Sequence, residues 1–380
     1  MASEHPPTIQ EASAAYESWL GGHITLLPED LAHKHTAMAS GVFPFLRATF
    51  YRWIQLWPQI CAPLREAATV LAVGDLHVEN FGTWRDAEGR LVWGINDFDE
   101  AFHLPYTNDL VRLATSAHLA IADGGLAITP KDGDTAILDG YRKCLEDGGR
   151  AVVLAEHWRA LRRMATERLK DPERFWQKLD ALPLLATERV PADAVAALAA
   201  LLPAANLPLR YGHRIAGLGS LGRERYVAIA DWHGGRIARE AKAAAPSASV
   251  WARHGSGESK VLYQTVLEKS VRCPDPFVML KQRWIVRRLA PDCSRIELAE
   301  LPEEQDAVRL LHSMGWETAN IHLGSANAQT LLLDLASHPQ GWLHTAAKEM
   351  RAAVTADWEA WRGPVSGKPP VKKEGKAAKN

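Results

Sequence analysis

A glycine-rich loop followed by a strand pattern, and not by a helix, places the strongest constraint on the fold of this chain. Residues 217–222 read GLGSLG, and residues 225–230, RYVAIA, are strand-like in composition. A turn at residues 233–235 (HGG) leads into another strand-like segment at residues 236–242. A dinucleotide-binding fold needs a helix directly after such a loop. The order strand, loop, strand instead favours a hairpin whose backbone N–H groups cover phosphates.

The composition is that of a globular protein. The chain has 380 residues, of which 47% are hydrophobic and 23% are charged, so wholesale disorder is excluded. Lys and Arg total 44 and Asp and Glu total 45, which gives a net charge of -1 and argues against bulk electrostatic binding to nucleic acid or to a membrane surface. The four cysteines form no CxxC pair, so we expect neither a disulfide scaffold nor a zinc ribbon. With no signal-peptide pattern and no membrane-length apolar run, the predicted location is cytoplasmic.

Helical and strand-like patterns are mixed along the chain, which predicts an α+β fold. Most of the first 70 residues read as helical. Short apolar strands are expected at residues 69–73 and 90–95, with turn composition at residues 84–89 between them. Beyond the strands around the glycine loop, a further strand is expected at residues 284–286, and helices at residues 108–122, 132–146, 151–169, 192–202, 257–269, 303–322 and 340–361. The last stretch, residues 363–380, is rich in Pro, Gly and Lys and reads as a disordered tail.

Two polar segments follow the two short apolar strands. They are GDLHVENFG at residues 74–82 and NDFDE at residues 96–100. Turn chemistry would explain either segment by itself, because Asp, Asn and Gly are the usual turn formers. Two such segments on consecutive strands instead favour a site. The oxygen ligands Asp75, Asn80 and Asp97 suit Mg²⁺, and a carboxylate that does not bind the metal can accept a proton from an attacking hydroxyl.

Three neighbouring residues have simpler interpretations. His77 is expected to be a structural histidine and Glu79 a solvated charge. Asp109 opens the helical pattern at residues 108–122 and is expected to cap its N-terminus.

These segments resemble a known superfamily. GDLHVEN followed by INDFDEA is similar to the GDLHxxN and IDFDDA segments of aminoglycoside phosphotransferases and choline-kinase-like enzymes, in the protein-kinase-like superfamily. The longer string from FPFLRA to NDFDEAFHLPYTNDLVRLATS resembles more closely an uncharacterised bacterial family, the domain of unknown function 2252, which is grouped with that superfamily. The resemblance covers residues 43–116 and 217–327. It implies a two-lobed kinase-like fold, with a helix-rich catalytic lobe and a small antiparallel-sheet nucleotide lobe.

The resemblance also implies roles for individual residues. Asp75 matches the catalytic-loop aspartate that orients or deprotonates the acceptor hydroxyl, and Asn80 and Asp97 match the metal-binding residues. Asp99 stands where protein kinases have a glycine, and Val73 stands where many members have the histidine that braces the loop. The phosphate-covering loop corresponds to three glycines, namely Gly217, Gly219 and Gly222.

A lysine on the third strand completes the kinase pattern. Lys242 matches the lysine that contacts the nucleotide phosphates, and Arg239 competes for the same role. A surface lysine at the end of a strand is the simpler interpretation of Lys242. The helical glutamate that pairs with the lysine in kinases is either Glu258 or Glu268, and the sequence does not choose between them.

The order of these parts along the chain differs from that of ordinary kinases, in which the glycine loop precedes the catalytic loop. Here the catalytic loop comes first, and residues 311–322 resemble the helix that normally leads into it. We therefore expect a circular permutation. The expected division is a catalytic and helical lobe at residues 1–205, a nucleotide lobe at 206–300, returning helices at 301–362 and the tail at 363–380.

The function expected from this resemblance is an ATP- and Mg²⁺-dependent phosphotransferase that acts on an unidentified hydroxyl acceptor. A nucleotide-binding pseudokinase without turnover is the main alternative. A metal-dependent phosphoesterase is a third hypothesis, because Asp75 and His77 match the Asp-x-His start of binuclear phosphatases. The chain lacks the GDxxD and GNH segments of those enzymes. The expected partners are therefore a nucleotide and a hydroxyl compound, with no nucleic acid and no membrane.

Overall fold

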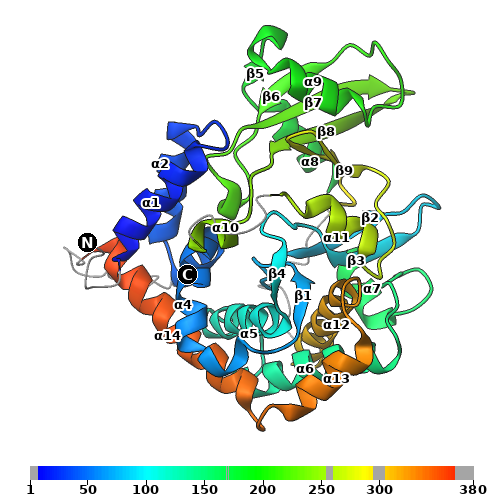
Figure 1. Cartoon of the computed structure of the whole chain (residues 1–380). Helices are drawn as coiled ribbons and strands as arrows, with labels where there is room; N and C mark the ends of the chain where they lie inside the picture. Colours follow the sequence, from blue (N-terminus) through cyan, green and yellow to red (C-terminus); the bar gives the residue numbers. More distant parts are fainter. Residues whose placement is uncertain (1–6, 168, 170, 254–259, 294–303, 364–380) are drawn as a thin grey trace, which may run out of the picture.

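The protein combines a helix-rich body with an antiparallel sheet. The computed structural model describes residues 7–167, 169, 171–253, 260–293 and 304–363. Figure 1 shows the largest sheet at the top of the view, the body below it, and the first two helices along one side. The predicted mixed α+β class is thus confirmed. Within the described residues, no helix combines the length and the apolar character that crossing a membrane requires.

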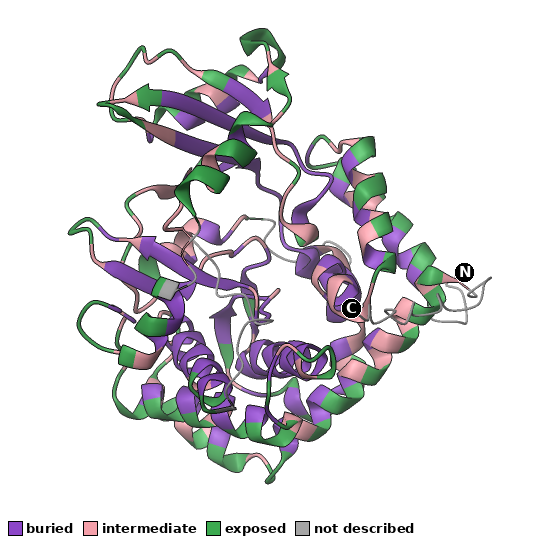
Figure 2. Ribbon diagram, turned by 180° about the vertical axis from the view of Figure 1, so that it is seen from behind, coloured by how far each residue is buried: buried purple, intermediate pink, exposed green. Residues whose placement is uncertain are grey.

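The centre of the body is a helix that is buried along most of its length. This helix, α5, spans Tyr106–Ala122, and all but its last two residues are buried. Figure 2 shows the same pattern, with inner helices of the body buried and the outer turns exposed. Around it lie α6 (Pro130–Glu146), α12 (Glu304–His322), α13 (Ala328–Ser337) and α14 (Trp342–Arg362). The sequence predicts all of these except α13.

Helices α6 and α12 cross at close range because each has a glycine at the crossing. A Cβ atom at Gly140 of α6 would clash with the carbonyl group of His312. In the same way, a Cβ at Gly315 of α12 would clash with the carbonyl group of Ile137. Small residues at a helix crossing allow the two backbones to approach.

The two ends of the described chain pack against each other. The N-terminal helices are α1 (Ile9–Gly21), α2 (Pro28–Ala39), α3 (Val42–Ala48) and α4 (Phe50–Ile60), followed by the short η1 (Ala62–Leu64). The Gln10 side chain donates a hydrogen bond to the carbonyl of Ala360 on α14 (2.8 Å), and Arg52 on α4 pairs with Asp357 (2.8 Å). Figure 1 also shows α1 next to α14.

The strands that flank the two polar segments form two separate two-stranded sheets. Strand β1 (Thr69–Ala72) pairs with β4 (Phe102–Pro105), and β2 (Phe81–Arg85) pairs with β3 (Leu91–Ile95). Both predicted strands exist, but they are not neighbours in one hairpin. The hairpin partner of β3 is β2, a strand that the sequence analysis did not predict and that begins directly after the polar residues 74–80.

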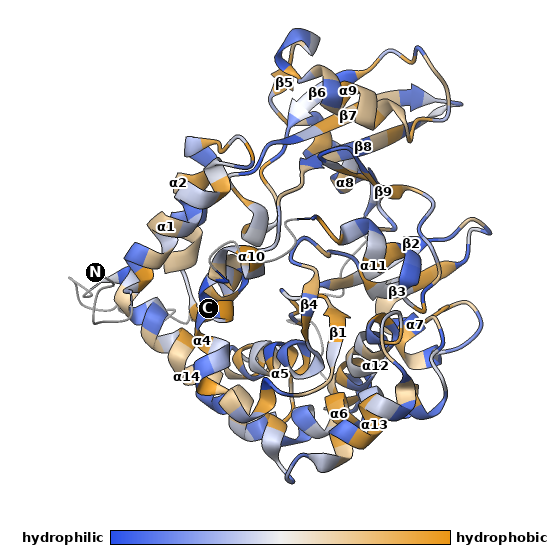
Figure 3. Cartoon of the chain, in the orientation of Figure 1, coloured by the Kyte–Doolittle hydropathy of each residue, from blue (hydrophilic) through white to orange (hydrophobic). Residues whose placement is uncertain are grey.

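The large sheet has six antiparallel strands in the order β5-β6-β7-β8-β10-β9. Its strands are β5 (Leu184–Leu185), β6 (Arg210–His213), β7 (Arg225–Trp232), β8 (Gly235–Ala243), β9 (Val278–Lys281) and β10 (Trp284–Leu289). The predicted strands on either side of the turn at residues 233–235 are confirmed as β7 and β8. Figure 3 shows orange, hydrophobic positions along the sheet strands and on β1, whereas outer turns are bluer.

The remaining helices depart from the sequence prediction. Of residues 151–169, only α7 (Arg159–Glu167) is helical, and part of residues 257–269 forms α11 (Tyr263–Lys269). Helices α8 (Pro172–Asp180), α9 (Ala192–Ala199) and α10 (Ala248–Ala252) complete the described set, together with η2 (Thr187–Arg189). Except for Gly363, the predicted tail lies outside the described residues. All four cysteines are free, as expected.

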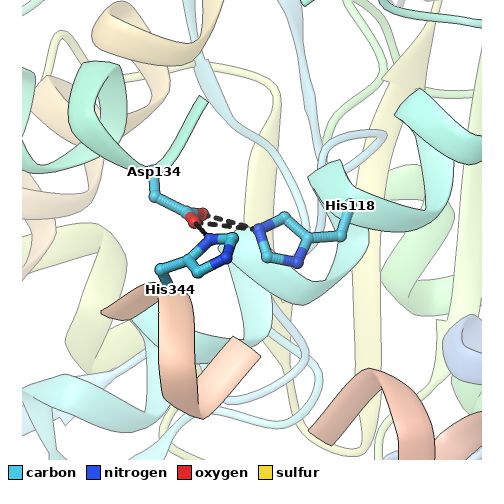
Figure 4. A group of neighbouring side chains, drawn as sticks. All are labelled: His118, Asp134 and His344. Atoms are coloured by element: carbon cyan, nitrogen blue, oxygen red, sulfur yellow. Dashed lines mark hydrogen bonds and ion pairs between the residues drawn. The ribbon is translucent and has the colours of Figure 1, made fainter. Parts of the chain in front are cut away.

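A buried aspartate joins three helices of the body. Asp134 on α6 accepts hydrogen bonds from His118 Nε2 on α5 (2.9 Å) and from His344 Nδ1 on α14 (2.8 Å), as Figure 4 shows. His118 and Asp134 are almost fully buried, and His344 is partly exposed. This His–Asp–His unit therefore connects the last long helix to the centre of the body.

The same three side chains are potential metal ligands, since their ligand atoms lie within 4.8 Å of one another. Two ligands bound about 2.0–2.1 Å from one tetrahedral zinc ion would lie about 3.4 Å apart. The observed contacts of 2.8 and 2.9 Å are shorter and match direct hydrogen bonds. We therefore treat the unit as a hydrogen-bonded connection between helices.

Replacing Asp134 should destabilise the protein measurably. Asp134→Ala leaves two histidine N–H groups without an acceptor in a mostly buried site, so we expect the free energy of unfolding to fall by about 2–3 kcal/mol. Urea denaturation measures this change. Asp139→Ala on the same helix is the matched control, because Asp139 pairs with Arg142 at the exposed surface. Its effect should stay within about 0.5 kcal/mol, and an equal effect of both variants would contradict this role of Asp134.

Candidate active site

Three loops and the end of one strand converge between the body and the large sheet. The first loop contains Asp75 and Asn80 and follows β1, and the second contains Asp97 and follows β3. The third is the glycine loop between β6 and β7, which includes the short η3 (Leu218–Ser220). Lys242 is the penultimate residue of β8. The structure therefore brings together residues that are far apart in the sequence.

Asp75 is held by a fully buried arginine. Arg112 of α5 donates from Nε to Asp75 Oδ1 (2.9 Å) and makes a second hydrogen bond to the same oxygen from Nη2. The guanidinium also donates to the carbonyl of Leu46 (2.9 Å) and lies over the rings of Phe50 and Trp53, 5.2 and 4.9 Å from their centroids. Burial raises the pKa of Asp75, and the charge of Arg112 opposes this rise.

The backbone before Asp75 is fixed by Asp109. The carboxylate of Asp109 accepts hydrogen bonds from the backbone N–H groups of Val73 (2.7 Å) and Gly74 (3.0 Å). His322 Nε2 donates to the same carboxylate (3.1 Å), and the Tyr141 hydroxyl donates to His322 Nδ1 (2.9 Å) in the matching tautomer. This network braces a loop that has Val73 in place of the expected histidine.

The prediction that Asp109 caps its helix is wrong. Helix α5 begins at Tyr106, so Asp109 lies within its first turn, and the N-cap residue Pro105 has no side-chain cap. Because the loop after β1 packs against this turn, the carboxylate serves the N–H groups of the loop instead of those of its own helix.

Asn80 links the two polar segments. Its Nδ2 donates to the backbone carbonyls of Asp75 (3.3 Å) and Asp97 (3.0 Å). Its Oδ1 is buried and has no hydrogen-bond partner among the described residues, while the Asp97 side chain beside it is 30% exposed. An unpartnered amide oxygen next to a carboxylate is the donor set that Mg²⁺ prefers.

Lys242 lies at the predicted place beside Asp97. Its Nζ is 3.3 Å from Asp97 Oδ1 and 2.5 Å from Asp99 Oδ2. Burial opposes ionisation of Asp97, but the charges of Lys242 and Arg287 outweigh it and hold the pKa of Asp97 well below its usual range. Burial and repulsion from Asp97 raise the pKa of Asp99. The lysine is thus not an exposed residue at the end of a strand.

The alternative to Lys242 as the phosphate contact and the described candidate for its glutamate partner lie away from this cluster. Arg239 faces the opposite side of β8, where it donates to the carbonyl of Leu201 (2.8 Å) and lies over the Phe277 ring. Glu268 is exposed and hydrogen-bonds Gln264 (2.9 Å), and Glu258 lies outside the described residues. The described partners of Lys242 are two aspartates of the body, and Glu268, one of the two helical glutamates left open as its partner, bonds elsewhere.

The three loop glycines have different surroundings. A Cβ at Gly219 would lie 2.9 Å from the carbonyl oxygen of Arg47 and 3.3 Å from Asp75 Oδ2, so the loop approaches the catalytic candidate directly. Gly217 has a positive φ of 74° and lies beside the Arg225 side chain. Gly222 instead packs against Leu31, and its carbonyl accepts a hydrogen bond from the Leu27 N–H (2.8 Å). Gly222 therefore supports the contact with the N-terminal helices.

Two cavities meet at these residues. The small one, of about 50 Å³, is lined by Asp75, Asn80 and the N-terminal helices, and the large one, of about 820 Å³, lies beneath the sheet. Asp97 and Gly217 line both cavities. The large cavity is rich in cations: Arg174, Lys178, Arg214, Arg225, Arg272, Arg287 and Arg288.

Three of these arginines surround one buried carboxylate. Glu240 of β8 accepts hydrogen bonds from Arg214 (2.5 Å), Arg225 (2.7 Å) and Arg287 (2.9 Å). Their charges hold the pKa of Glu240 well below its usual range, although burial opposes this. One carboxylate and three guanidinium groups leave an excess of positive charge facing the cavity. The sequence analysis did not identify this cluster of Glu240 and its arginines. Because side chains alternate along a strand, Glu240 and Lys242 lie on the same face of β8, and this spacing could have indicated the cluster.

The carboxyl of Glu100, which lines the small cavity, should make stability depend on pH. It accepts hydrogen bonds from Arg223 (3.2 Å) and from the Ala248 N–H (2.6 Å), yet burial raises its pKa from 4.5 to about 7. The folded protein thus holds a proton that the unfolded chain releases between about pH 4.5 and pH 7. Stability should fall as the pH rises through this window.

Glu100→Gln should remove this part of the decrease, which amounts to about 3 kcal/mol. Urea unfolding at about pH 5 and pH 8, without divalent cations, compares the two proteins. The exposed Glu88→Gln is the control and should keep the wild-type decrease. The interpretation of Glu100 fails if Glu100→Gln loses as much stability over this range as the wild type.

One family model matches part of the chain. Residues 26–175 match the model of a family described as "Uncharacterized protein conserved in bacteria (DUF2252)". The matched range contains Asp75, Asn80 and Asp97, and it ends before the glycine loop and Lys242. No curated protein and no solved structure matches the chain. The predicted similarity to this uncharacterised bacterial family is thus confirmed over residues 26–175.

Proposed function

We propose that this protein is an ATP- and Mg²⁺-dependent phosphotransferase with a circularly permuted, kinase-like arrangement of two lobes. The observation that carries the proposal is the meeting of two cavities at Asp97 and Gly217. A group-transfer enzyme needs a donor site and an acceptor site that share the point of transfer. The large cavity would hold the nucleotide, and the small cavity, which Asp75 lines, would hold the acceptor hydroxyl.

The lining of the large cavity supports a nucleotide. Its arginines offer planar, multiply donating groups that match phosphate oxygens. Apolar side chains of Phe175, Leu179, Leu182 and Leu289 also line it and suit the flat face of a base. Its volume of about 820 Å³ is within the range of small-molecule sites.

The residues at the junction fit a divalent cation. Asn80 Oδ1 and the Asp97 carboxylate would hold Mg²⁺, which would neutralise charge on the phosphate oxygens. Lys242 orients Asp97 through their ion pair and adds a positive charge beside the phosphates.

Asp75 would act on the acceptor. In the proposed step the acceptor hydroxyl oxygen forms a bond to the terminal phosphorus of ATP, and the bond from that phosphorus to the ADP oxygen breaks. The hydroxyl proton goes to the Asp75 carboxylate. Burial raises the pKa of Asp75, which strengthens it as a base, while Arg112 fixes its orientation.

The contact between the segment after α12 and strand β1 supports the permutation. The segment after α12 meets β1 directly, because Ser325 Oγ accepts a hydrogen bond from the Leu71 N–H (2.7 Å). In an unpermuted order, α12 would lead into β1 and the Asp75 loop. Helices α1 and α14, the first and last described helices, lie side by side, as the hydrogen bond from Gln10 to the carbonyl of Ala360 shows, and a permutation needs chain segments that are close together in this way.

The phosphoesterase and the pseudokinase can each be distinguished from the proposed phosphotransferase. A phosphoesterase would need Asp75 and His77 in a metal-binding cluster. Among the described residues, the group of three potential His, Cys, Asp or Glu ligands is instead His118, Asp134 and His344. A pseudokinase would bind nucleotide and transfer nothing, so it differs from our proposal in turnover alone.

Thermal-shift measurements with ATP, GTP and Mg²⁺ test the proposal. Ligand present at about 100 times its dissociation constant should stabilise the protein by about 2.7 kcal/mol, which raises the melting temperature by a few degrees. Asp97→Asn should lose the Mg²⁺-dependent part of this shift and all nucleotide turnover. Asp231→Asn, at an exposed position of β7, is the control and should behave as the wild type.

Absence of any shift with every nucleotide would overturn the proposal. A shift without ATP hydrolysis or transfer to any acceptor would support the pseudokinase instead. Mg²⁺-dependent turnover that persists in Asp97→Asn would show that the metal is held by other residues.

A side chain at Gly219 should separate the glycine loop from Asp75. The Cβ in Gly219→Ala would press on the Arg47 carbonyl and the Asp75 carboxylate, so the loop must shift. We expect phosphoryl transfer to fall by about 100-fold, because small displacements of reacting groups have effects of this size. Gly235→Ala, where the nearest atom is 3.8 Å away, is the matched control and should keep the wild-type rate. Equal rates in both variants would show that this approach does not matter.

A further inference from the structure

The small cavity is closed on one side by the N-terminal helices. Tyr16 of α1, Lys34 of α2, Arg47 of α3 and Tyr51 of α4 all line it. The opposite side carries Asp75 and the glycine loop. Whatever binds beside Asp75 therefore also contacts side chains from the first four helices, none of which the sequence analysis assigned to the site.

Lys34 has an unusual environment for a lysine. The residue is 2% exposed, and its ammonium lies 5.7 Å from the centroid of the Tyr51 ring. Within the described part of the chain, no carboxylate lies at ion-pair distance from it. Burying an ammonium without a carboxylate partner is energetically unfavourable.

Four other buried cations near the site are paired. Each has a carboxylate within hydrogen-bond distance, as in the pairs Arg112–Asp75, Arg223–Glu100, Arg225–Glu240 and Lys242–Asp99. Lys34 differs from these four. The carboxylates around the cavity are therefore already engaged by other cations, whereas one ammonium that lines it is not.

Two arginines add unused donors to the same cavity. Arg47 pairs with Glu79 through Nη1, but its Nε has no hydrogen-bond partner among the described residues. Arg223 donates to Glu100 from Nη2 (3.2 Å), and its Nη1 lies 3.7 Å from Asp99 Oδ2, but within the described residues neither Nη1 nor Nε makes a hydrogen bond. Buried donors without partners mark a place where a ligand supplies the acceptors.

We propose that Lys34, assisted by Arg47 and Arg223, binds an anionic group of the acceptor. The acceptor is then a small hydroxyl compound that carries a carboxylate or a phosphate. This inference rests on the proposed function, since it assigns the substrate class of the acceptor site. A cationic acceptor fits less well, because it would lie against an ammonium that has no carboxylate at ion-pair distance within the described residues, although Glu17, Glu100 and Asp75 lie near enough to favour its charge.

The size of the cavity limits this acceptor. About 50 Å³ of space is open in the small cavity, compared with about 820 Å³ in the large one. The anionic group must lie near Lys34 while the hydroxyl reaches Asp75, so the two groups of the acceptor are separated by a short linker. Burial lowers the pKa of Lys34 to about 8, which leaves the ammonium mostly charged at neutral pH.

Binding of four small compounds to the full-length protein tests the proposal. The probes are glycerate, glycerol 3-phosphate, inorganic phosphate and the neutral compound glycerol, each measured by calorimetry without nucleotide. We expect the wild type to bind glycerate or glycerol 3-phosphate more tightly than glycerol. Lys34→Met should weaken this binding by about 10–100-fold, the effect of losing a charge-assisted hydrogen bond. Comparison of glycerate with glycerol 3-phosphate identifies the anion.

Lys281→Met on β9 is the matched control, because Lys281 is exposed and should leave anion binding unchanged. Lys34→Gln, which keeps a donor without the charge, is a second variant in case the first does not fold. The melting temperature separates the proposal from a structural role. Removal of a buried, unpaired charge should leave the free protein as stable as the wild type or more stable.

Three results would overturn the assignment. They are equal binding of glycerol and of the anions, unchanged anion binding in Lys34→Met, and a strong loss of stability in both Lys34 variants. Failure of the proposed function would look different, because nucleotide and Mg²⁺ would then produce no thermal shift while Lys34-dependent anion binding persists. Anion binding that survives in Lys34→Met would come from the arginines of the large cavity.

Discussion

The ion cluster of Lys242 with Asp97 and Asp99 is the interaction on which the site depends. It joins the end of strand β8 to the loop after β3, and these segments are about 145 residues apart in the chain. Arg223, which lies just before β7, adds ion pairs to Asp99 (3.7 Å) and Glu100 (3.2 Å) of the same loop, so the sheet and the body share a network of charges beside the point where the two cavities meet. Because Lys242 is nearly fully buried, the pair is shielded from solvent and fixes the position of the Asp97 carboxylate more firmly than a surface pair could.

A single helix holds the other half of the site. Asp109 and Arg112 are three residues apart on α5 and therefore lie on the same side of the helix. Asp109 fixes the backbone at Val73 and Gly74, and Arg112 fixes the side chain of Asp75. The loop that carries Asp75 is therefore attached to a helix that is buried along most of its length, which helps to hold the loop in one position.

Much of this arrangement could be predicted from the sequence, and the failures have physical reasons. The strand patterns on either side of residues 233–235 located Lys242 on its strand, the motifs located Asp97 after another strand, and the structure brings the two side chains into contact. Strand β2 was missed because its five residues directly follow a polar loop and include a glycine. The role of Asp109 was missed because an aspartate at the start of a helical pattern normally caps it, and only the tertiary packing shows the loop beside it.

Lys34 shows a different limit of sequence reasoning. A lysine in an ordinary amphipathic helix such as α2 is normally solvated, and the pattern PEDLAHKHTAMA gives no sign of burial. Its environment arises only when α2 packs beside the glycine loop, where Gly222 contacts Leu31. The net charge of -1 likewise hides the local distribution, because the cations that line the large cavity outnumber its anions. Since low-dielectric walls focus the field of such a group, the potential inside the cavity depends on this local excess and not on the total charge of the chain.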